Sequence, residues 1–194
     1  MAALRVKLML TAYTLDRRDR IIAVSPEWDQ FALDNEGRSA CADLVVGGRL
    51  MDAITGDSVR MFMTAILMRV RVSGQSEAVP YRCDSPTTKR RFVMVLEPLA
   101  DGGVRVTHHL EYEELTNLRI RVRTADYGQR APQRCSICCR IREEGVWVDP
   151  FEENRNRDLW VIHTLCDDCK QAPLQRYRQR QLRDPPETAQ ALGA

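Results

Sequence analysis

Four of the seven cysteines form two CxxC pairs, one at Cys135 and Cys138 and one at Cys166 and Cys169. A CxxC turn places two thiolates on one side of a tight loop, so two such turns brought together offer four sulfurs to one tetrahedral ion. Zinc is the usual metal of an S4 set, and a closed set leaves no position for a catalytic water. The spacing therefore predicts a structural zinc site, with a redox dithiol or ordinary buried cysteines as the alternatives.

Two residues next to these pairs, Cys139 and His163, are further possible ligands of the metal. Cys139 directly follows Cys138, and the sequence alone does not decide which two of the three sulfurs at 135, 138 and 139 point inward. His163 stands three residues before Cys166, close enough to replace a sulfur or to donate a hydrogen bond to one. Because four cysteines already complete a zinc site, we expect His163 to lie outside the ligands themselves.

A second candidate site is the interior of the N-terminal half. Apolar and polar residues alternate over 104–111, and this alternation turns His108 inward and His109 outward. An inward histidine is most often a hydrogen-bonded core residue, and the alternative is a haem ligand, which is the less common case. Trp28, Phe31 and Phe62 lie on predicted helices and are candidate lining residues of the same ligand pocket.

Catalytic motifs are missing from the sequence. It has no phosphate-binding glycine loop, no Ser/His/Asp set with a supporting motif, and only 3 histidines. We therefore expect no enzymatic activity. No stretch approaches the roughly 20 apolar residues that cross a bilayer, and the N-terminus lacks a signal-peptide pattern, so we expect a cytoplasmic protein without a membrane partner.

The elements that would position these residues follow from hydropathy patterns. The 194 residues, 44% of them hydrophobic, suffice for one ordinary domain and a smaller appendage. Two short strands flank a charged turn at 16–20, and the second leads into Ser25-Pro26-Glu27, a typical helix start. The first strand is expected to carry apolar Leu8, Leu10, Ala12 and Leu15.

The middle of the chain predicts one long helix and three strands. Apolar residues recur at helical spacing from Val59 to Val70, and Gly74 supplies the stop. Strands are expected at 77–83, 90–99 and 103–113. An antiparallel sheet with helices inserted after its first hairpin has to cover one face with those helices, so the fold class is α+β. The other face needs a second subunit or the chain's own termini.

About half of the chain carries an ordered set of motifs. They are DRIIAVSPEWDQFA at 19–32, GRLMD at 48–52, PYRCDSP at 80–86 and paired arginines at 90–91. Together they resemble a bacterial subgroup of PAS domains, over about residues 13–114. The resemblance implies a PAS-like antiparallel sheet with helices on one face, acting as a sensor or dimerisation domain, and a homodimer is expected.

The same resemblance extends to the C-terminal part. Such proteins often carry C-x-x-C-x-R-I, a tryptophan and H-x-x-C-x-x-C, and this chain has CSICCRI at 135–141, Trp147 and HTLCDDC at 163–169. It departs from the pattern at Cys139, where a basic or polar residue is usual. A small zinc-ribbon or knuckle-like module is implied, with a hairpin near Trp147, a helical turn near Trp160, and both indoles over the metal loops.

These observations divide the chain into four expected segments. They are a PAS-like sensory domain at 1–115, a linker at 116–134, a zinc module at 135–175 and a basic, disordered tail at 176–194. The predicted function is that of a non-enzymatic signalling protein whose zinc module contacts an unknown protein partner. A thiol or zinc redox sensor is one alternative.

The other alternative is a nucleic-acid-binding regulator that uses arginines near the zinc module. Arginines alternating with apolar residues are also typical of the solvent-facing side of a strand. Aromatic side chains suited to base stacking are few, and the nearby ones are Tyr127 and Tyr177. The basic residues concerned are Arg119, Arg121, Arg123, Arg130, Arg134, Arg140, Arg142, Lys170, Arg176, Arg178, Arg180 and Arg183.

Overall fold

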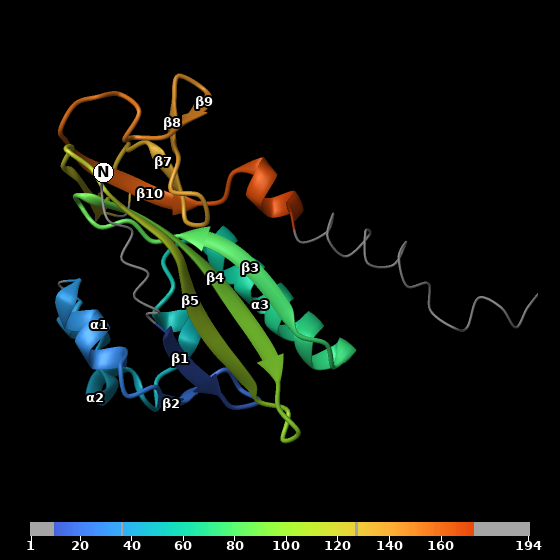
Figure 1. The fold of residues 1–194 in the computed structure, drawn as a ribbon. Helices are drawn as coiled ribbons and strands as arrows, with labels where there is room; N and C mark the ends of the chain where they lie inside the picture. The colour runs from blue at the N-terminus through green and yellow to red at the C-terminus, as the bar shows by residue number, and fades with distance from the viewer. Residues whose placement is uncertain (1–9, 36, 127, 173–194) are drawn as a thin grey trace, which may run out of the picture.

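The computed structural model describes residues 10–35, 37–126 and 128–172, and these residues form two five-stranded sheets (Figure 1). The first sheet has the strand order β2-β1-β5-β4-β3 and is antiparallel throughout. The second sheet has the order β6-β10-β7-β8-β9 and lies at one end of the first. The expected tail at 176–194, with Tyr177, and the expected aromatic Tyr127 lie outside the described residues.

The first sheet and its helices follow the predicted element order. Its strands are β1 (Leu10–Leu15), β2 (Ile21–Val24), β3 (Glu77–Arg82), β4 (Thr88–Pro98) and β5 (Val104–Leu115). Between β2 and β3 come α1 (Trp28–Asp34), η1 (Arg38–Ala40), α2 (Ala42–Val45), η2 (Leu50–Asp52) and α3 (Asp57–Ser73). The α+β class, an antiparallel sheet with helices inserted after its first hairpin, is confirmed.

The helix α3 covers one face of the first sheet and encloses its core (Figure 1). It begins after Gly56 and ends at Gly74, which adopts a left-handed φ of 65° and caps the helix by donating to the carbonyl of Val70. Its buried side chains recur at helical spacing, as the sequence predicted. They are Val59, Met63, Ile66, Leu67 and Val70.

The first strand contains Leu10, Ala12 and Leu15, as expected. The side chains of β1 that face the core are Thr11, Tyr13 and Leu15, whereas Ala12 is only half-buried. Ala12 and Leu15 differ in parity along the strand, so they cannot face the same side. The register agrees, because Tyr13 lies opposite the buried Val106 of β5. Leu8 lies outside the described residues.

The start of the first helix differs from expectation. The helix begins at Trp28, and its N-cap residue makes no side-chain capping bond. The hydroxyl of Ser25 instead accepts a hydrogen bond from the backbone N–H of Ala12, at 3.2 Å. Ser25 therefore connects the chain before α1 to strand β1 rather than capping the helix.

The second sheet begins inside the stretch that was expected as a linker. Its strands are β6 (Ile120–Thr124), β7 (Gln133–Cys135), β8 (Ile141–Glu143), β9 (Val146–Val148) and β10 (Arg157–Thr164). β6 and β7 run parallel to β10 on either side of it, and β8 and β9 continue antiparallel. Residues 116–134 thus supply β6 and the start of β7, so they are part of a sheet.

The hairpin expected near Trp147 is formed by β8 and β9. The helical turn expected near Trp160 is absent, because Trp160 lies within strand β10. Helical backbone occurs instead at 167–172, shortly after the end of β10.

None of the helices in the described part of the chain combines the length and the apolar character that crossing a bilayer requires.

Candidate metal centre

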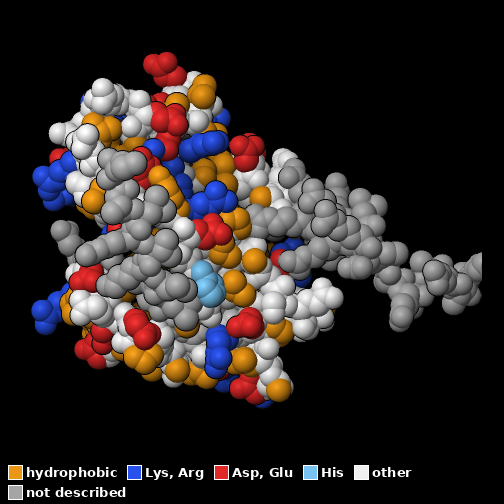
Figure 2. All heavy atoms as spheres, viewed as in Figure 1, with side chains coloured by type: hydrophobic (Ala, Val, Ile, Leu, Met, Phe, Trp, Pro, Cys, Tyr) orange, Lys and Arg blue, Asp and Glu red, His pale blue; other side chains and the backbone are white. Residues whose placement is uncertain are grey.

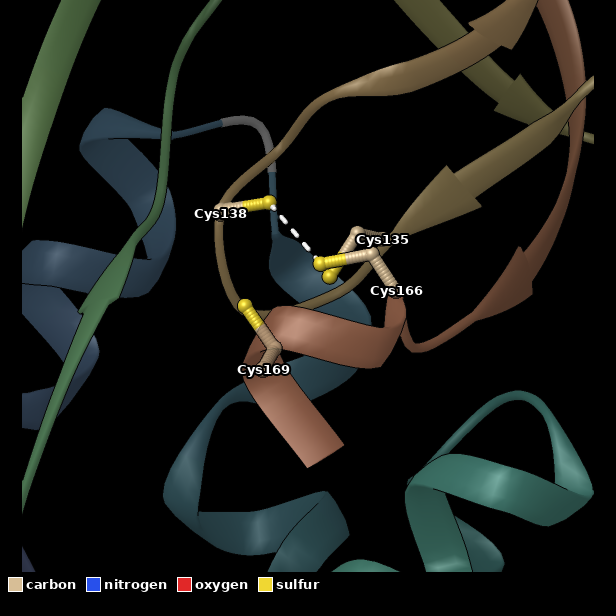
Figure 3. Close-up of side chains that lie close together, drawn as sticks. All are labelled: Cys135, Cys138, Cys166 and Cys169. Atoms are coloured by element: carbon tan, nitrogen blue, oxygen red, sulfur yellow. Dashed lines mark hydrogen bonds between the residues drawn. The ribbon is translucent and has the colours of Figure 1, made fainter. Parts of the chain in front are cut away.

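The sulfur atoms of Cys135, Cys138, Cys166 and Cys169 all lie within 4.8 Å of one another, and their side chains converge (Figure 3). Cys135 ends strand β7, and the turn after it carries Cys138. Cys166 and Cys169 lie at the start of the helical segment 167–172. The parallel pairing of β7 with β10 is what brings the two CxxC turns together.

The spacing of the sulfurs fits one tetrahedral ion. Four sulfurs at about 2.3 Å from a metal in tetrahedral geometry lie about 3.8 Å from one another. The Sγ atoms of Cys138 and Cys166 are 3.8 Å apart. The cluster can therefore hold a metal ion without rearrangement of the backbone.

The surroundings of the cluster are largely apolar. Cys135 is 0% and Cys166 2% exposed, and both pack with Val59 of α3 and with Leu165. Trp147 packs against the same group, as expected of it. Trp160 is not part of this group, and 47% of its surface is exposed. Of the two indoles, only one covers the metal loops.

The thiols perturb one another in the way expected of a metal-binding set. Hydrogen bonds from the side chains of Cys138 and Cys169 lower the pKa of Cys135. Sharing a proton with Cys135 raises the pKa of Cys138 to about 11 and also raises the pKa of Cys169. Four thiolates cannot all form at this distance unless a cation offsets their charge.

The structure places Cys139 outside the cluster. Its backbone has a left-handed φ of 61°, and its side chain is buried on the other side of the turn. The Arg134 guanidinium donates to its sulfur at 2.9 Å, and its thiol donates to the carbonyl of Arg82 at 3.4 Å. Burial raises the pKa of Cys139 to about 12, so it remains a neutral thiol. The geometry thus brings Cys138, and not Cys139, to the other three sulfurs.

His163 also lies beside the cluster rather than in it. Its Nδ1 is 3.3 Å from the hydroxyl of Ser136, in the turn between Cys135 and Cys138. Burial lowers the pKa of His163, and the charge of Arg134 lowers it further, so the ring is neutral near pH 7. The imidazole therefore supports the CxxC turn through Ser136.

The second sheet and its two CxxC turns, together called the cysteine unit, are joined to the first sheet by close backbone and hydroxyl contacts. The Ser58 and Thr164 hydroxyl oxygens are 3.1 Å apart, and the N–H of Arg82 in β3 donates to the carbonyl of Ile137 at 2.7 Å. Gly56, at φ 94°, lies so near β10 that a Cβ there would be 2.5 Å from the carbonyl oxygen of His163. The start of α3 and the end of β3 are thus in direct contact with both CxxC turns.

An ion-pair network supports the same junction. Arg82 contacts Asp84 at 2.6 Å and Asp149 at 2.7 Å, and Lys89 lies 3.4 Å from Asp149. Burial acts to raise the pKa of Asp149, but the hydrogen bonds from Arg82 and from the Phe151 N–H, together with the charges of Arg82 and Lys89, lower that pKa below its usual value. Because these charges are only partly exposed, the pairing aligns β3 with the loop after β9.

The candidate ligand-pocket residues surround an aromatic interior in the first sheet. His108 faces inward, and its Nδ1 is 2.7 Å from the hydroxyl of Tyr81. Burial lowers the pKa of His108 to about 4. Trp28 packs edge-on against Tyr13 and donates from its indole N–H to the carbonyl of Ala40 at 2.6 Å. His108 is thus a neutral, hydrogen-bonded histidine among aromatic rings.

The other two pocket candidates are placed differently. Phe31 packs edge-on against Phe92, at 6.2 Å between ring centroids. Phe62 lies between the core of the first sheet and the cysteine cluster and packs against both. Three of the four candidates therefore belong to the aromatic interior, whereas Phe62 belongs to the junction with the cysteine unit.

Sequence reasoning missed several residues of this junction. Ser58 and Thr164 carried no signal, because a hydroxyl pair 106 residues apart leaves no pattern in the sequence. Arg82 lies within the PYRCDSP motif at 80–86, but its ion-pair partner Asp149 is distant in the chain. Tyr81 could have been found, because it shares the inward parity of Val79 on β3.

No family model matches the chain, and a search of the curated proteins returned no match. Among solved structures, the chain is similar to a domain of an HTR-like protein from Haloarcula marismortui, at 13% identity and a TM-score of 0.39, covering 53% of this chain and 98% of that one. It is also similar to the PAS domain of the RpfR quorum-sensing receptor of Cronobacter turicensis, solved in complex with C12:0. That likeness has 12% identity and a TM-score of 0.41, covering 56% of this chain and 100% of that one.

Proposed function

We propose that the protein is a non-enzymatic, cytoplasmic signalling or regulatory protein. Its PAS-like sheet serves as a sensor or dimerisation unit, and a zinc-stabilised C-terminal sheet carries the resulting change to a partner protein. The single observation that supports this most is the position of the four-cysteine cluster, which lies against the start of α3 and the end of β3.

Zinc is the metal that this donor set favours. Thiolate ligands in a tetrahedral set select zinc or iron–sulfur chemistry, and a set of two CxxC turns with 3.8 Å between sulfurs suits a single ion. Bound zinc would supply folding energy to this unit. Cys135, Cys138, Cys166 and Cys169 would hold it, and Ser136 with His163 would orient the first turn.

The junction gives a physical route between the two units. Val59 and Phe62 of α3 pack against the cysteine cluster, while Met63 and Ile66 of the same helix pack in the core of the first sheet. A rearrangement of that core, on binding a ligand or a second subunit, would therefore move the start of α3 against the CxxC turns. A homodimer through the first sheet is part of the same proposal.

The first experiment is metal analysis of full-length protein purified under reducing conditions, together with its absorbance spectrum. We expect about one zinc per chain and no visible chromophore. A protein that binds no zinc, or that carries iron–sulfur absorbance, would contradict the metal assignment. A Soret band would instead assign a haem to the interior around His108.

A second experiment tests the coupling itself. Removing the metal with a chelator should increase amide hydrogen exchange at 56–62, where α3 meets the cluster, while β5 near Val104 and Val106 stays protected. Unchanged exchange at 56–62 would show that the two units do not communicate through α3.

The exposure of two ligands favours a second candidate function, that of a redox sensor. Cys138 and Cys169 are half-buried, so an oxidant can reach them, and the sulfurs of Cys138 and Cys166 are 3.8 Å apart. Peroxide would be reduced to water as two thiols form one disulfide and release the metal. Zinc release at low peroxide, reversed by a thiol reductant, would support this function, and zinc retention would exclude it.

A further inference from the structure

Strand β10 of the second sheet carries an exposed tryptophan next to an exposed isoleucine. Trp160 is 47% exposed on β10, and Ile162, two residues on and therefore on the same face, is 42% exposed. The Arg123 guanidinium of β6 lies over the indole ring, 5.4 Å from its centroid. Large aromatic side chains left open on a sheet surface indicate a binding surface.

The pairing of strands places arginines on this same face. Arg123 is in register with Trp160, and Arg121 is in register with Asp158. Gln133 of β7 is in register with Ile162 and with Arg142 of β8. Paired residues on neighbouring strands point to the same side of a sheet. We call this surface, formed by Trp160, Ile162, Arg121, Arg123 and Arg142, the Trp160 face.

A hollow lies directly beside the indole. It is a cavity of about 610 Å³ lined by Trp160 and by the loop residues Asp126, Gln129, Arg130, Ala131 and Pro132. Among these residues, the Gln129 side chain donates to the carboxylate of Asp126 at 3.1 Å. Its volume lies in the range of small-molecule and nucleobase-sized sites. The hollow thus offers an aromatic wall with amide and carboxylate groups at its rim.

The charges around the Trp160 face are unbalanced. Three carboxylates elsewhere in this unit are paired, since Glu143 and Glu153 contact Arg157 and Asp149 contacts Arg82. Within the described part of the chain, none of the arginines around the face forms an ion pair with a carboxylate. These unpaired arginines are Arg119, Arg121, Arg123, Arg130 and Arg142.

Figure 2 shows Lys and Arg side chains, together with Asp and Glu side chains, among hydrophobic ones over the part of the molecule that the second sheet forms. Asp158 is the one carboxylate in register on the face, against the three arginines of its strands. The surface is therefore complementary to a polyanion with apolar, planar groups, which describes unpaired nucleic acid better than an acidic peptide.

We propose that the Trp160 face binds single-stranded nucleic acid. An unpaired base stacks against the indole of Trp160 in the hollow, and the unpaired arginines contact the phosphates on either side. A base held inside a duplex cannot enter the hollow, so a duplex binds more weakly than a single strand. This activity does not depend on the PAS-like unit having a ligand or a partner.

The test is fluorescence anisotropy with labelled 12-nucleotide oligo(dT) and oligo(U), titrated with zinc-loaded full-length protein at low salt. We expect single strands of one or both kinds to bind, and the blunt duplex of the same length to bind at least tenfold more weakly. Tighter binding of oligo(dT) would identify DNA as the ligand, and tighter binding of oligo(U) would identify RNA. Affinity should fall as salt rises, with a slope near −0.7 for each phosphate contact.

Variants assign the binding to this face. Trp160→Ala should weaken binding about tenfold or more, with an unchanged salt slope. Arg123→Gln should weaken binding and reduce the salt slope by about 0.7. Arg18→Gln removes the same charge from an exposed turn of the first sheet and should leave both quantities unchanged. Zinc content, measured for each variant, shows whether the second sheet is intact.

Two results would overturn the proposal. One is absence of an anisotropy change at micromolar protein and low salt, or binding that Trp160→Ala and Arg18→Gln weaken equally. The other is sedimentation showing a dimer that Trp160→Ala converts to a monomer, because the face would then be an interface between copies of the chain. Neither result bears on zinc content, so a failure here is distinct from a failure of the proposed signalling function.

Discussion

The two sheets of this protein differ in what fills their interiors. The first encloses apolar side chains from both strands and helices, among them Leu15, Leu67 and Leu96, each 0% exposed. The second has three strands of only three residues each, and its cysteine end buries Cys135 and Cys166 with just one apolar residue of its own, Leu165. The fourth buried member of that cluster, Val59, comes from the other unit.

The difference shows that the two units are stabilised by different means. Apolar burial contributes about 1.5–3 kcal/mol for each large side chain, and the first sheet has enough such residues to fold on this basis. The second sheet buries fewer apolar side chains, so we expect its stability to depend on a metal and on the surface of its neighbour as well. Its buried apolar residues are Ile120, Ile141, Phe151, Val161 and Leu165.

The largest effect is expected from removing a ligand. Cys166→Ser should abolish stoichiometric zinc binding, because three thiolates do not close the site, and amide protection should be lost over 133–164. Residues 88–115 of the first sheet should stay protected. Metal analysis measures the zinc stoichiometry, and hydrogen exchange measures the amide protection of the two sheets.

The matched control for that change is Cys139→Ser. Its sulfur bonds to Arg134 and lies outside the cluster, so the variant should keep its zinc and lose only about 1–2 kcal/mol of stability. Loss of zinc from Cys139→Ser with retention in Cys138→Ser would reverse the assignment of the two adjacent cysteines.

A smaller but still large effect is expected where the units touch. Gly56→Ala should lower the free energy of unfolding by about 3 kcal/mol or more, because the new Cβ would lie 2.5 Å from the His163 carbonyl and the residue has φ 94°. Gly74→Ala, at φ 65° and ψ 12° in the left-handed helical region with open space around it, should cost about 1 kcal/mol. Urea denaturation compares them, and equal losses would mean that the close approach is unimportant.

A third effect concerns the histidine inside the first sheet. Because burial lowers the folded-state pKa of His108 to about 4, the unfolded chain takes up a proton below about pH 6.5 that the folded chain refuses. His108 therefore makes its full contribution to the free energy of unfolding above about pH 6.5. That contribution, up to about 3 kcal/mol, is lost as the pH falls toward 4.

The measurement is urea denaturation of wild type and His108→Gln at pH 7.5 and pH 5.0. Acid also releases zinc, and comparing the two proteins removes that common contribution. The wild type should lose more stability than the variant between the two pH values. A variant that loses as much would show that His108 is protonated in the folded protein.

The smallest effect is expected from one hydroxyl at the junction. Ser58→Ala removes the contact with Thr164 and should cost about 1 kcal/mol, while Ser39→Ala, at an exposed position in η1, should cost nothing measurable. Thermal unfolding of the zinc-loaded proteins is sufficient to detect this difference. If the loss appears only in hydrogen exchange of 133–164, the contact stabilises the second sheet alone.

Much of the first sheet could be predicted because its information is local. The spacing from Val59 to Val70 and the stop at Gly74 describe α3 without reference to the rest of the chain. Which side chains of β1 face inward, namely Thr11 and Tyr13 with Leu15, could not be predicted, because residues of either parity are apolar or small and the neighbouring strand decides the register. Trp160 was misplaced for the same reason, since a parallel strand depends on partners far away in sequence.

The sequence by itself determined the types and spacings of the donors: two CxxC pairs, an inward histidine and the helical period of the central helix. Such features depend on residues a few positions apart, so covalent geometry alone constrains them. Only the tertiary structure decided that Cys139 turns toward Arg134, that β10 joins both CxxC turns, and that Trp160 is left open beside unpaired arginines. These depend on contacts between segments distant in the chain, whose energies no local pattern encodes.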